Sequence, residues 1–326
     1  MGKSTFKDKT MRYFWRLLFA VLFLNAGIYP ALACGWLYRS LLDGTVIKSD
    51  RISDTPQAHF DLNSPNARKV LNQKLHQAWD IYRKSHAIKD YNDFGAMLMY
   101  SGQYERAQKI FQEIEAKKPG LYATAANLGT VDELLGDDRE AYRWIKRALE
   151  INPDSHHGSE WIHLKILEAK VHAKGGPHYF RTHNILGLDF GQDEIPVKKT
   201  KRDLHQTKKQ LYYQLAERMS FIQPKDPVVA QLLFDAGNIS AIIDDVKTAL
   251  DIYAQARQYG YSGELIDKRE KYFQQLQQKA EKQQQGDYTR PLYIGIAILL
   301  VLLAVSAGAI WLVVKVVKME LKRRHS

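Results

Sequence analysis

Two stretches of the sequence repeat each other at a distance of 34 residues. Residues 91–119 are YNDFGAMLMYSGQYERAQKIFQEIEAKKP, and residues 125–153 are AANLGTVDELLGDDREAYRWIKRALEINP. A repeat at a fixed period indicates a supersecondary unit that is used more than once. Small or helix-breaking residues coincide in register: Gly95 with Gly129, Gly102 with Gly136, Ala107 with Ala141, and Pro119 with Pro153.

Each of these positions has a physical reason in a pair of packed helices. In the first unit, Gly95 lies inside the first helix, where the missing side chain lets the second helix approach closely. Gly102 follows that helix and suits a left-handed cap. Ala107 lies at the seam in the second helix, and Pro119 ends that helix because proline cannot continue it. The second unit repeats these roles, so the pattern predicts two consecutive helix–turn–helix units.

The pattern resembles the tetratricopeptide repeat, whose unit is a helix–turn–helix of about 34 residues. The resemblance covers residues 88–121 and 122–155, and residues 156–174 continue it as a partial unit in which His163 replaces the glycine. It implies an all-α fold, a right-handed superhelical solenoid of helix–turn–helix units that binds other proteins or peptide segments.

The rest of the sequence divides around this repeat array. Ser64-Pro65 opens a helix that we expect to cap the array. Gly237, Ala249 and Tyr253 repeat the spacing of the first unit, which predicts degenerate repeat-like helices. The expected segments are an irregular segment at 34–62, a cap and repeats at 63–174, an inserted loop at 175–201, degenerate helices at 202–260, and a Gln- and Lys-rich helical spacer at 261–290.

The inserted loop at 175–201 does not fit the repeat. Gly175-Gly176-Pro177 stops the preceding helix. A loop of this length is either disordered or functional. The stretch from His183 to Gly191 is apolar and holds two glycines, which favours packing, along the groove of the array.

The C-terminal region contains an apolar segment, Leu292 to Val314, which has 23 residues without a charge. At about 1.5 Å per residue a helix of this length spans about 34 Å, enough for the hydrocarbon layer of a membrane. The sequence therefore predicts a transmembrane helix at 291–314 and a basic cytoplasmic tail at 315–326.

Residues 1–33 have the features of a secretory signal sequence. A basic region precedes the apolar run Leu17–Ala26, and Ala31-Leu32-Ala33 supplies small residues for signal peptidase. An uncleaved anchor is the alternative. Cleavage would place Cys34, the one cysteine of the chain, at the mature N-terminus, which resembles a bacterial lipoprotein site, although ordinary signal peptidase fits the preceding residues better.

The formal net charge of +11 lies mostly at the two ends. Residues 1–33 and 315–326 each carry a net charge of +4, which leaves +3 for residues 34–314. This distribution is typical of membrane flanks and does not indicate a nucleic-acid partner.

Motifs of catalysis are missing from the sequence. It contains no P-loop, no G-x-S-x-G and no H-E-x-x-H. His156, His157, His163 and His172 cluster, but no cysteine or tightly spaced carboxylate completes a metal site. We interpret them as surface and cap histidines, and we expect no catalytic residue, no metal and no cofactor.

The concave face of a tetratricopeptide solenoid is lined mainly by the first helices. On that register the resemblance implies a partner-binding face at Asn92, Ala96, Met99, Tyr100, Ala126, Thr130 and Glu133. These residues lack the basic pair with which some members clamp a peptide carboxylate. We therefore expect a helix or extended segment held by apolar and neutral contacts. Contact with neighbouring repeats or with the inserted loop is the alternative role for each residue.

These observations favour a non-enzymatic, membrane-anchored scaffold for protein–protein interactions at the cell envelope. In this hypothesis the protein crosses the inner membrane once, and the repeat domain lies in the periplasm. The alternative is a cytosol-facing, tail-anchored assembly or quality-control factor. Removal of the N-terminal segment on maturation would exclude that alternative.

Overall fold

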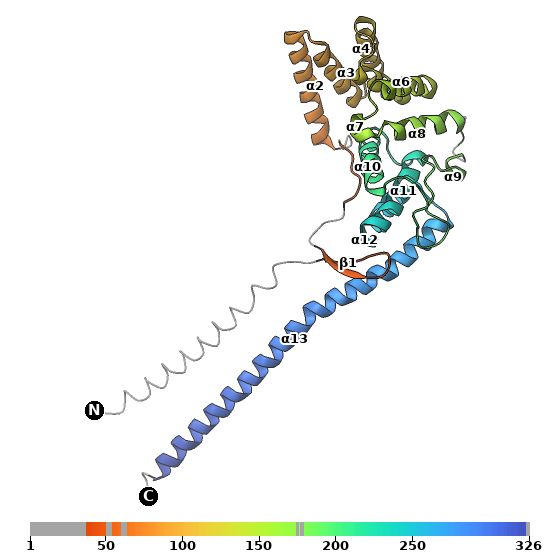
Figure 1. Ribbon diagram of the computed structural model, residues 1–326. Coiled ribbons are helices and arrows are strands. Elements are labelled where there is room, and N and C mark those ends of the chain that lie inside the picture. Colours follow the sequence, from red (N-terminus) through yellow and green to blue (C-terminus); the bar gives the residue numbers. More distant parts are fainter. Residues whose placement is uncertain (1–36, 50–53, 60–63, 174–175, 177–178, 324–326) are drawn as a thin grey trace.

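The computed structural model describes residues 37–49, 54–59, 64–173, 176 and 179–323. Within these residues the regular structure is helical except for one short hairpin (Figure 1). The helices stack beside their chain neighbours in the body of the molecule, and the last helix leaves the body as a long rod (Figure 1). The expected signal sequence and Cys34 lie outside the described residues.

The 34-residue period corresponds to two antiparallel helix pairs, α3 with α4 and α5 with α6. This confirms the predicted tetratricopeptide-like, all-α fold. The first half of the body consists of α2 (Pro65–Ser85), α3 (Ile88–Tyr100), α4 (Tyr104–Lys117), α5 (Tyr122–Leu134), α6 (Asp138–Ile151), α7 (Ser155–Gly158) and α8 (Glu160–Ala173).

Close contact between paired helices explains the small residues of the repeat. A Cβ atom on Gly95 would lie 2.6 Å from Phe111 Cε1, and one on Gly129 would lie 2.5 Å from Ile145 Cδ1. Ala107 and Ala141 are completely buried at the same seams. The remaining repeat positions lie at helix ends: Gly102 and Gly136 have positive φ, and Pro119 and Pro153 each follow the second helix of a pair by two residues.

The second half of the body contains another helix pair of the same kind. A Cβ atom on Gly237 in α11 would lie 2.4 Å from the ring of Tyr253 in α12, which is the contact that Gly95 makes in the first pair. The elements of this half are α9 (Tyr179–Thr182), α10 (Leu204–Phe221), α11 (Pro227–Ile243) and α12 (Val246–Gln258).

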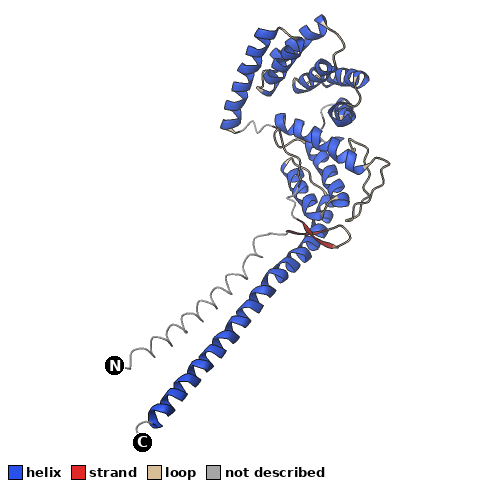
Figure 2. Cartoon of the chain, turned by 60° about the vertical axis from the view of Figure 1, so that its left-hand side comes forward, coloured by secondary structure: helices blue, strands red, loops and turns tan. Residues whose placement is uncertain are grey.

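A β-hairpin stands where an irregular segment was expected. Strands β1 (Leu37–Ser40) and β2 (Val46–Ser49) pair antiparallel and lie against the long helix (Figure 2). Ser40 Oγ donates to the Leu276 carbonyl at 2.6 Å, and Arg39 forms a buried ion pair with Asp245 at 3.2 Å. Because both partners lie more than 200 residues away, the local sequence gave no indication of this strand pair.

Helix α13 (Glu264–Arg323) has 60 residues, a length of about 90 Å at 1.5 Å per residue. Its first part was expected to be a spacer, but Ile266, Phe273, Leu276 and Ala280 are buried against α12 and the hairpin. Further along, Tyr293–Leu312 is the segment of the described chain that is long and apolar enough to cross a membrane, and none of it is buried in the protein.

The inserted loop packs, as its apolar content predicts, but not along the groove of the array. Ile185, Leu186, Leu188 and Phe190 are buried in a core that they share with α10, α11 and α12. The predicted location was wrong because α10, rather than the loop, faces the first helices of the repeats.

Candidate functional site

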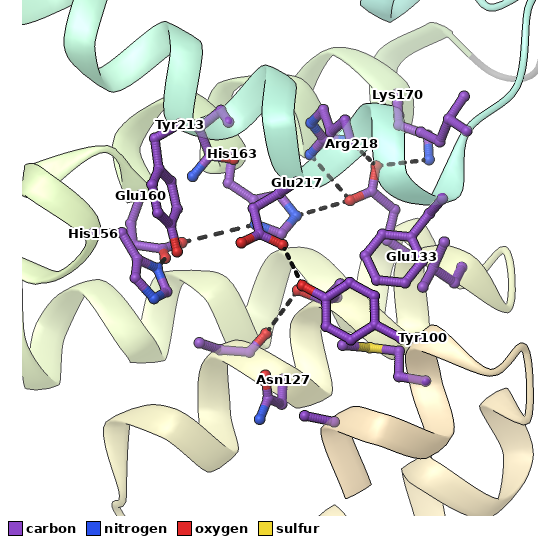
Figure 3. A pocket seen from close by; sticks show the side chains of 18 of the residues that line it. Tyr100, Asn127, Glu133, His156, Glu160, His163, Lys170, Tyr213, Glu217 and Arg218 are labelled. Atoms are coloured by element: carbon purple, nitrogen blue, oxygen red, sulfur yellow. Dashed lines mark hydrogen bonds and ion pairs between the residues drawn. The ribbon is translucent and has the colours of Figure 1, made fainter. Parts of the chain in front are cut away.

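A pocket of about 380 Å³, here called the groove pocket, lies on the inner face of the repeats. Helices α3, α5 and α8 form one side of it, and α10 forms the other (Figure 3). The side chains that converge on it therefore come from separate helices of the array and from a helix that follows the inserted loop.

Most of the residues that the repeat register assigned to a partner-binding face line this pocket. They are Ala96, Met99, Tyr100, Ala126, Thr130 and Glu133. Asn92 does not line it, but its Oδ1 accepts a hydrogen bond of 3.3 Å from Asn127 Nδ2, which belongs to a lining residue. The register thus locates one wall of the groove pocket.

The other wall comes from α10 and was not predicted. Tyr213, Gln214, Glu217, Arg218 and Phe221 line the pocket from that helix. Tyr100 is the main link between the walls: its hydroxyl donates to Glu217 Oε2 at 2.9 Å, and its ring stacks on Phe221 with centroids 4.8 Å apart. The sequence predicts a helix here, but nothing in it indicates which face turns toward the repeats.

Glu133 is the centre of a buried ionic network. Arg218 donates to both of its carboxylate oxygens, at 2.8 and 3.1 Å, His163 lies 2.8 Å away, and Lys170 lies 3.1 Å away (Figure 3). The side chains of Glu133, Arg218 and His163 are each at most 8% exposed. This network joins α5 to α8 and α10.

The network corrects two interpretations of the sequence. His163 was taken for a surface or cap histidine, but it is buried between Glu133 and Glu160. The groove was said to lack a basic pair, but Lys170 and Arg218 both line it. Their charges are already paired with Glu133, so they are not arranged to clamp a peptide carboxylate.

The pKa values of the network favour the charged forms. Burial alone would raise the pKa of Glu133, but Arg218, His163 and Lys170 outweigh it and hold this pKa well below its usual value. Burial alone would lower the pKa of His163, but its hydrogen bonds to Glu133 and Glu160 raise it. Each charge of the network around Glu133 therefore has a counter-charge beside it.

A second group of contacts closes the end of the groove pocket near α7. His156 stacks on Tyr213 with ring centroids 4.8 Å apart, and its Nδ1 lies 2.7 Å from Glu160 Oε1. Tyr122 donates to the same carboxylate oxygen at 2.8 Å. Burial alone would raise the pKa of Glu160, but His156 and His163 lower it, so this carboxylate is ionised.

Apolar and uncharged surface remains for a partner once these ion pairs are taken into account. Met99, Ala126 and Phe221 supply the apolar part. Asn127 and Thr130 supply neutral polar groups. Among the residues that the structure describes, no group of three or more His, Cys, Asp or Glu side chains could hold a metal ion. The arrangement is suited to binding, and its polar groups serve mainly to hold the walls in place.

The comparisons with known proteins bear on the fold alone. No protein-family profile matches the chain, and no curated protein sequence does. Among solved structures, the chain is similar to a tetratricopeptide repeat protein from Parabacteroides merdae, with 14% sequence identity and a TM-score of 0.33. The match covers 64% of this chain and 80% of that one. Because this likeness is weak, the assignment of a tetratricopeptide-like fold rests on the period of the sequence and on the helix pairs that it produces.

Proposed function

We propose that this protein is a membrane-anchored scaffold that binds a segment of another protein in the groove pocket. The observation that carries the proposal is the convergence of Ala96, Tyr100, Ala126 and Thr130 on one pocket at the inner face of the helix pairs. Helix-lined grooves commonly hold a peptide helix or an extended segment.

The chemistry of the groove pocket indicates which kinds of side chain the bound segment inserts into it. Paired charges around Glu133 contribute little to a new partner, since any competing charge must first break a buried ion pair. A volume of about 380 Å³ is at the lower end of the range for ligand sites. The partner therefore inserts one or two apolar or aromatic side chains, and its backbone forms hydrogen bonds with a neutral polar group such as Asn127.

The membrane anchor is the apolar segment Tyr293–Leu312, whose mean hydropathy is 2.6. We propose a single pass through the inner membrane, with the repeat domain in the periplasm and the basic tail in the cytoplasm, as the positive-inside rule favours. The alternative remains the cytosol-facing, tail-anchored factor, which would keep its N-terminal segment.

Photo-crosslinking from defined positions tests the groove. Benzoylphenylalanine replaces Ala96 in the pocket or, as the control, the exposed Lys109 on the outer helix α4 of the same unit. We expect one partner band from position 96 and none from position 109. Thr130→Trp, which fills the pocket, should remove the band, and Lys109→Trp should leave it. Equal crosslinking from both faces, or a band that survives Thr130→Trp, would contradict the proposal.

A further inference from the structure

A second cavity, the loop pocket, lies between loop residues 183–192, helix α11 and the beginning of α13. Its volume is about 670 Å³, and no residue lines both it and the groove pocket. Its chemistry therefore stands apart from the proposed peptide-binding site.

Arg269 forms hydrogen bonds that hold the loop in place beside this cavity. Its side chain is completely buried and donates to the carbonyl groups of Phe190, Gly191 and Asp193 at 2.8–3.0 Å. Hydrogen bonds from a charged donor are the stronger kind. The loop wall of the pocket is thus held in a defined conformation by a buried side chain.

Two polar side chains on α11, Asp235 and Asn238, line the loop pocket, and each has one atom without a hydrogen-bond partner. Asn238 Oδ1 accepts from Arg269 Nη1 at 2.6 Å and also from the Tyr253 hydroxyl, which fixes the orientation of the amide. Its Nδ2 then faces away from both donors and has no partner. Asp235 Oδ1 accepts from Asn184, and Asp235 Oδ2 has no partner. Both side chains are at most 1% exposed.

Asp235 Oδ2 is an unpaired acceptor and Asn238 Nδ2 is an unpaired donor. A ligand that has one donor and one acceptor can form a hydrogen bond with each of them. Residues three apart on a helix are neighbours, so Asp235 and Asn238 lie side by side on the face of α11 that lines the loop pocket. Buried polar groups are normally hydrogen-bonded, so two neighbouring side chains that each have an unpaired atom need an explanation. The pair calls for a ligand with a donor toward Asp235 and an acceptor toward Asn238.

The charges around the loop pocket select a cation. Asp189, Asp235 and Glu264 line it, whereas Arg269 is the one lysine or arginine among the described residues that does so. His183 and Tyr261 also face it, together with the ring of Phe234. Glu264 is paired with the exposed Lys268 at 2.6 Å, and the Arg269 guanidinium is occupied by Asn238 and the loop carbonyls, which leaves Asp189 and Asp235 as the carboxylates that can face a cation.

We propose that the loop pocket binds an ammonium group that carries a neutral hydrogen-bond acceptor on the neighbouring carbon. The ammonium donates to Asp235 Oδ2, and Asn238 Nδ2 donates to the acceptor. This chemistry occurs at the N-terminal residue of a peptide and in a free amino-acid amide.

Binding of an ammonium group by this route releases a proton. Burial raises the pKa of Asp235 to about 8, against the opposing effects of Asn184 and Arg269. At pH 6.5 the Asp235 carboxyl group is therefore neutral before an ammonium group binds. An α-amino group has a pKa of about 7.7–8.0 and is still protonated at that pH. The ammonium displaces the proton of Asp235, and about one proton leaves per ligand.

Isothermal titration calorimetry on the detergent-solubilised full chain at pH 6.5 tests the proposal. Two buffers of different ionisation enthalpy report proton release. The probes are alaninamide, the tripeptide trialanine amide, N-acetylalaninamide and isopropylamine. We expect alaninamide or the tripeptide to bind with release of about one proton, and the acetylated probe not to bind. Binding by the tripeptide alone assigns the site to peptide N-termini, whereas equal binding by alaninamide assigns it to a small amine.

Asp235→Asn is the matched variant, since its side chain keeps the shape and the bond to Asn184. It should weaken binding by about tenfold or more and abolish proton release. Asp267→Asn, an exposed carboxylate outside the pocket, should change neither. Asn238→Asp should remove the preference for alaninamide over isopropylamine. A wild-type chain that binds neither primary probe, or an Asp235→Asn chain that binds as well as wild type, would overturn the proposal.

The proposals for the loop pocket and for the groove pocket can be tested independently. Thr130→Trp fills the groove pocket and should leave alaninamide binding unchanged, because no lining residue is shared. Loss of alaninamide binding in Thr130→Trp would contradict the assignment to the loop pocket.

Discussion

A single methyl group at the helix seam decides how closely two repeat helices pack. Ala107 is completely buried in α4, and the neighbouring pair of Gly95 and Phe111 leaves no room for a larger side chain. We expect Ala107→Leu to overpack this seam and to cost about 1–3 kcal/mol of unfolding free energy. Thermal unfolding of the detergent-solubilised chain, followed by circular dichroism, should show a midpoint lowered by several degrees.

Lys109→Leu is the control for that substitution, since Lys109 is exposed on the same helix. It should leave the midpoint nearly unchanged. Ala141→Leu should behave as Ala107→Leu does, because Ala141 holds the equivalent place in the second unit. If both alanine variants unfold where the control unfolds, the 34-residue register does not describe the packing.

His163 makes the stability of the body depend on pH. Its pKa is raised in the folded chain, whereas an unfolded histidine has a pKa of about 6.5. A raised pKa contributes stability that is fully present below about pH 6.5 and is lost as the pH rises through the folded value. We expect the thermal midpoint to fall as the pH rises above about 6.5, measured by circular dichroism in buffers of equal ionic strength.

The slope assigned to His163 can be separated from other titrations. His163→Gln can still donate to Glu133 but does not titrate, so the variant should show a flatter pH profile. His172→Gln, an exposed position on the same helix, should keep the wild-type profile. An unchanged slope in His163→Gln would show that another group is responsible.

The residues of the site were only partly predictable. Ala96, Tyr100 and Thr130 follow from the register, because a helical period fixes which side chains share a face. The sequence shows that His163 replaces the glycine of the repeat, but not that Glu133 binds it. Arg218, the strongest partner of Glu133, is 85 residues away in sequence, and no local pattern reports such a contact.

At the scale of helices, strong periodicity predicted α3 to α6 closely, whereas tertiary contacts decide the roles of α10 and α13. Helix α10 is buried on several sides and has no clear apolar stripe, with Gln210, Gln214 and Arg218 among its buried residues. The polar surface of α13 suggested a spacer, because its buried residues are spaced among many glutamines. The polar composition of this part of α13 therefore gave no indication of the face that packs on α12.

Phe273 tests whether the beginning of α13 belongs to the folded body. It is completely buried, and its ring stacks on Tyr253 with centroids 5.8 Å apart. We expect Phe273→Ala to cost about 3–5 kcal/mol, as deletion of a buried aromatic ring does. The exposed neighbour Gln274→Ala should have little effect on the same thermal midpoint. Equal midpoints for the two variants would support a detached spacer.

For the whole molecule, the packing of α13 has a mechanical consequence. One helix includes the buried Ile266 and Phe273 as well as the apolar segment Tyr293–Leu312. The hairpin braces this helix, since Tyr38 and Lys48 both contact Asp287. In the proposed membrane-anchored state, a helix that continues from the core would hold the groove pocket at a set distance and orientation from the membrane, which a flexible linker would not do.

The charges beside the apolar segment favour one orientation of the proposed anchor. Lys315, Lys318 and Lys322 follow the apolar segment, and an excess of lysine and arginine marks the cytoplasmic side of a membrane helix. We therefore expect the tail in the cytoplasm and the repeat domain outside it. In a Cys34→Ser background, a single cysteine is placed either at the exposed Lys117 or at Ser326, and intact spheroplasts are treated with a membrane-impermeant maleimide. Lys117→Cys should be labelled at once, and Ser326→Cys only after permeabilisation. The reverse pattern would place the groove pocket in the cytosol, where the tail-anchored alternative requires it.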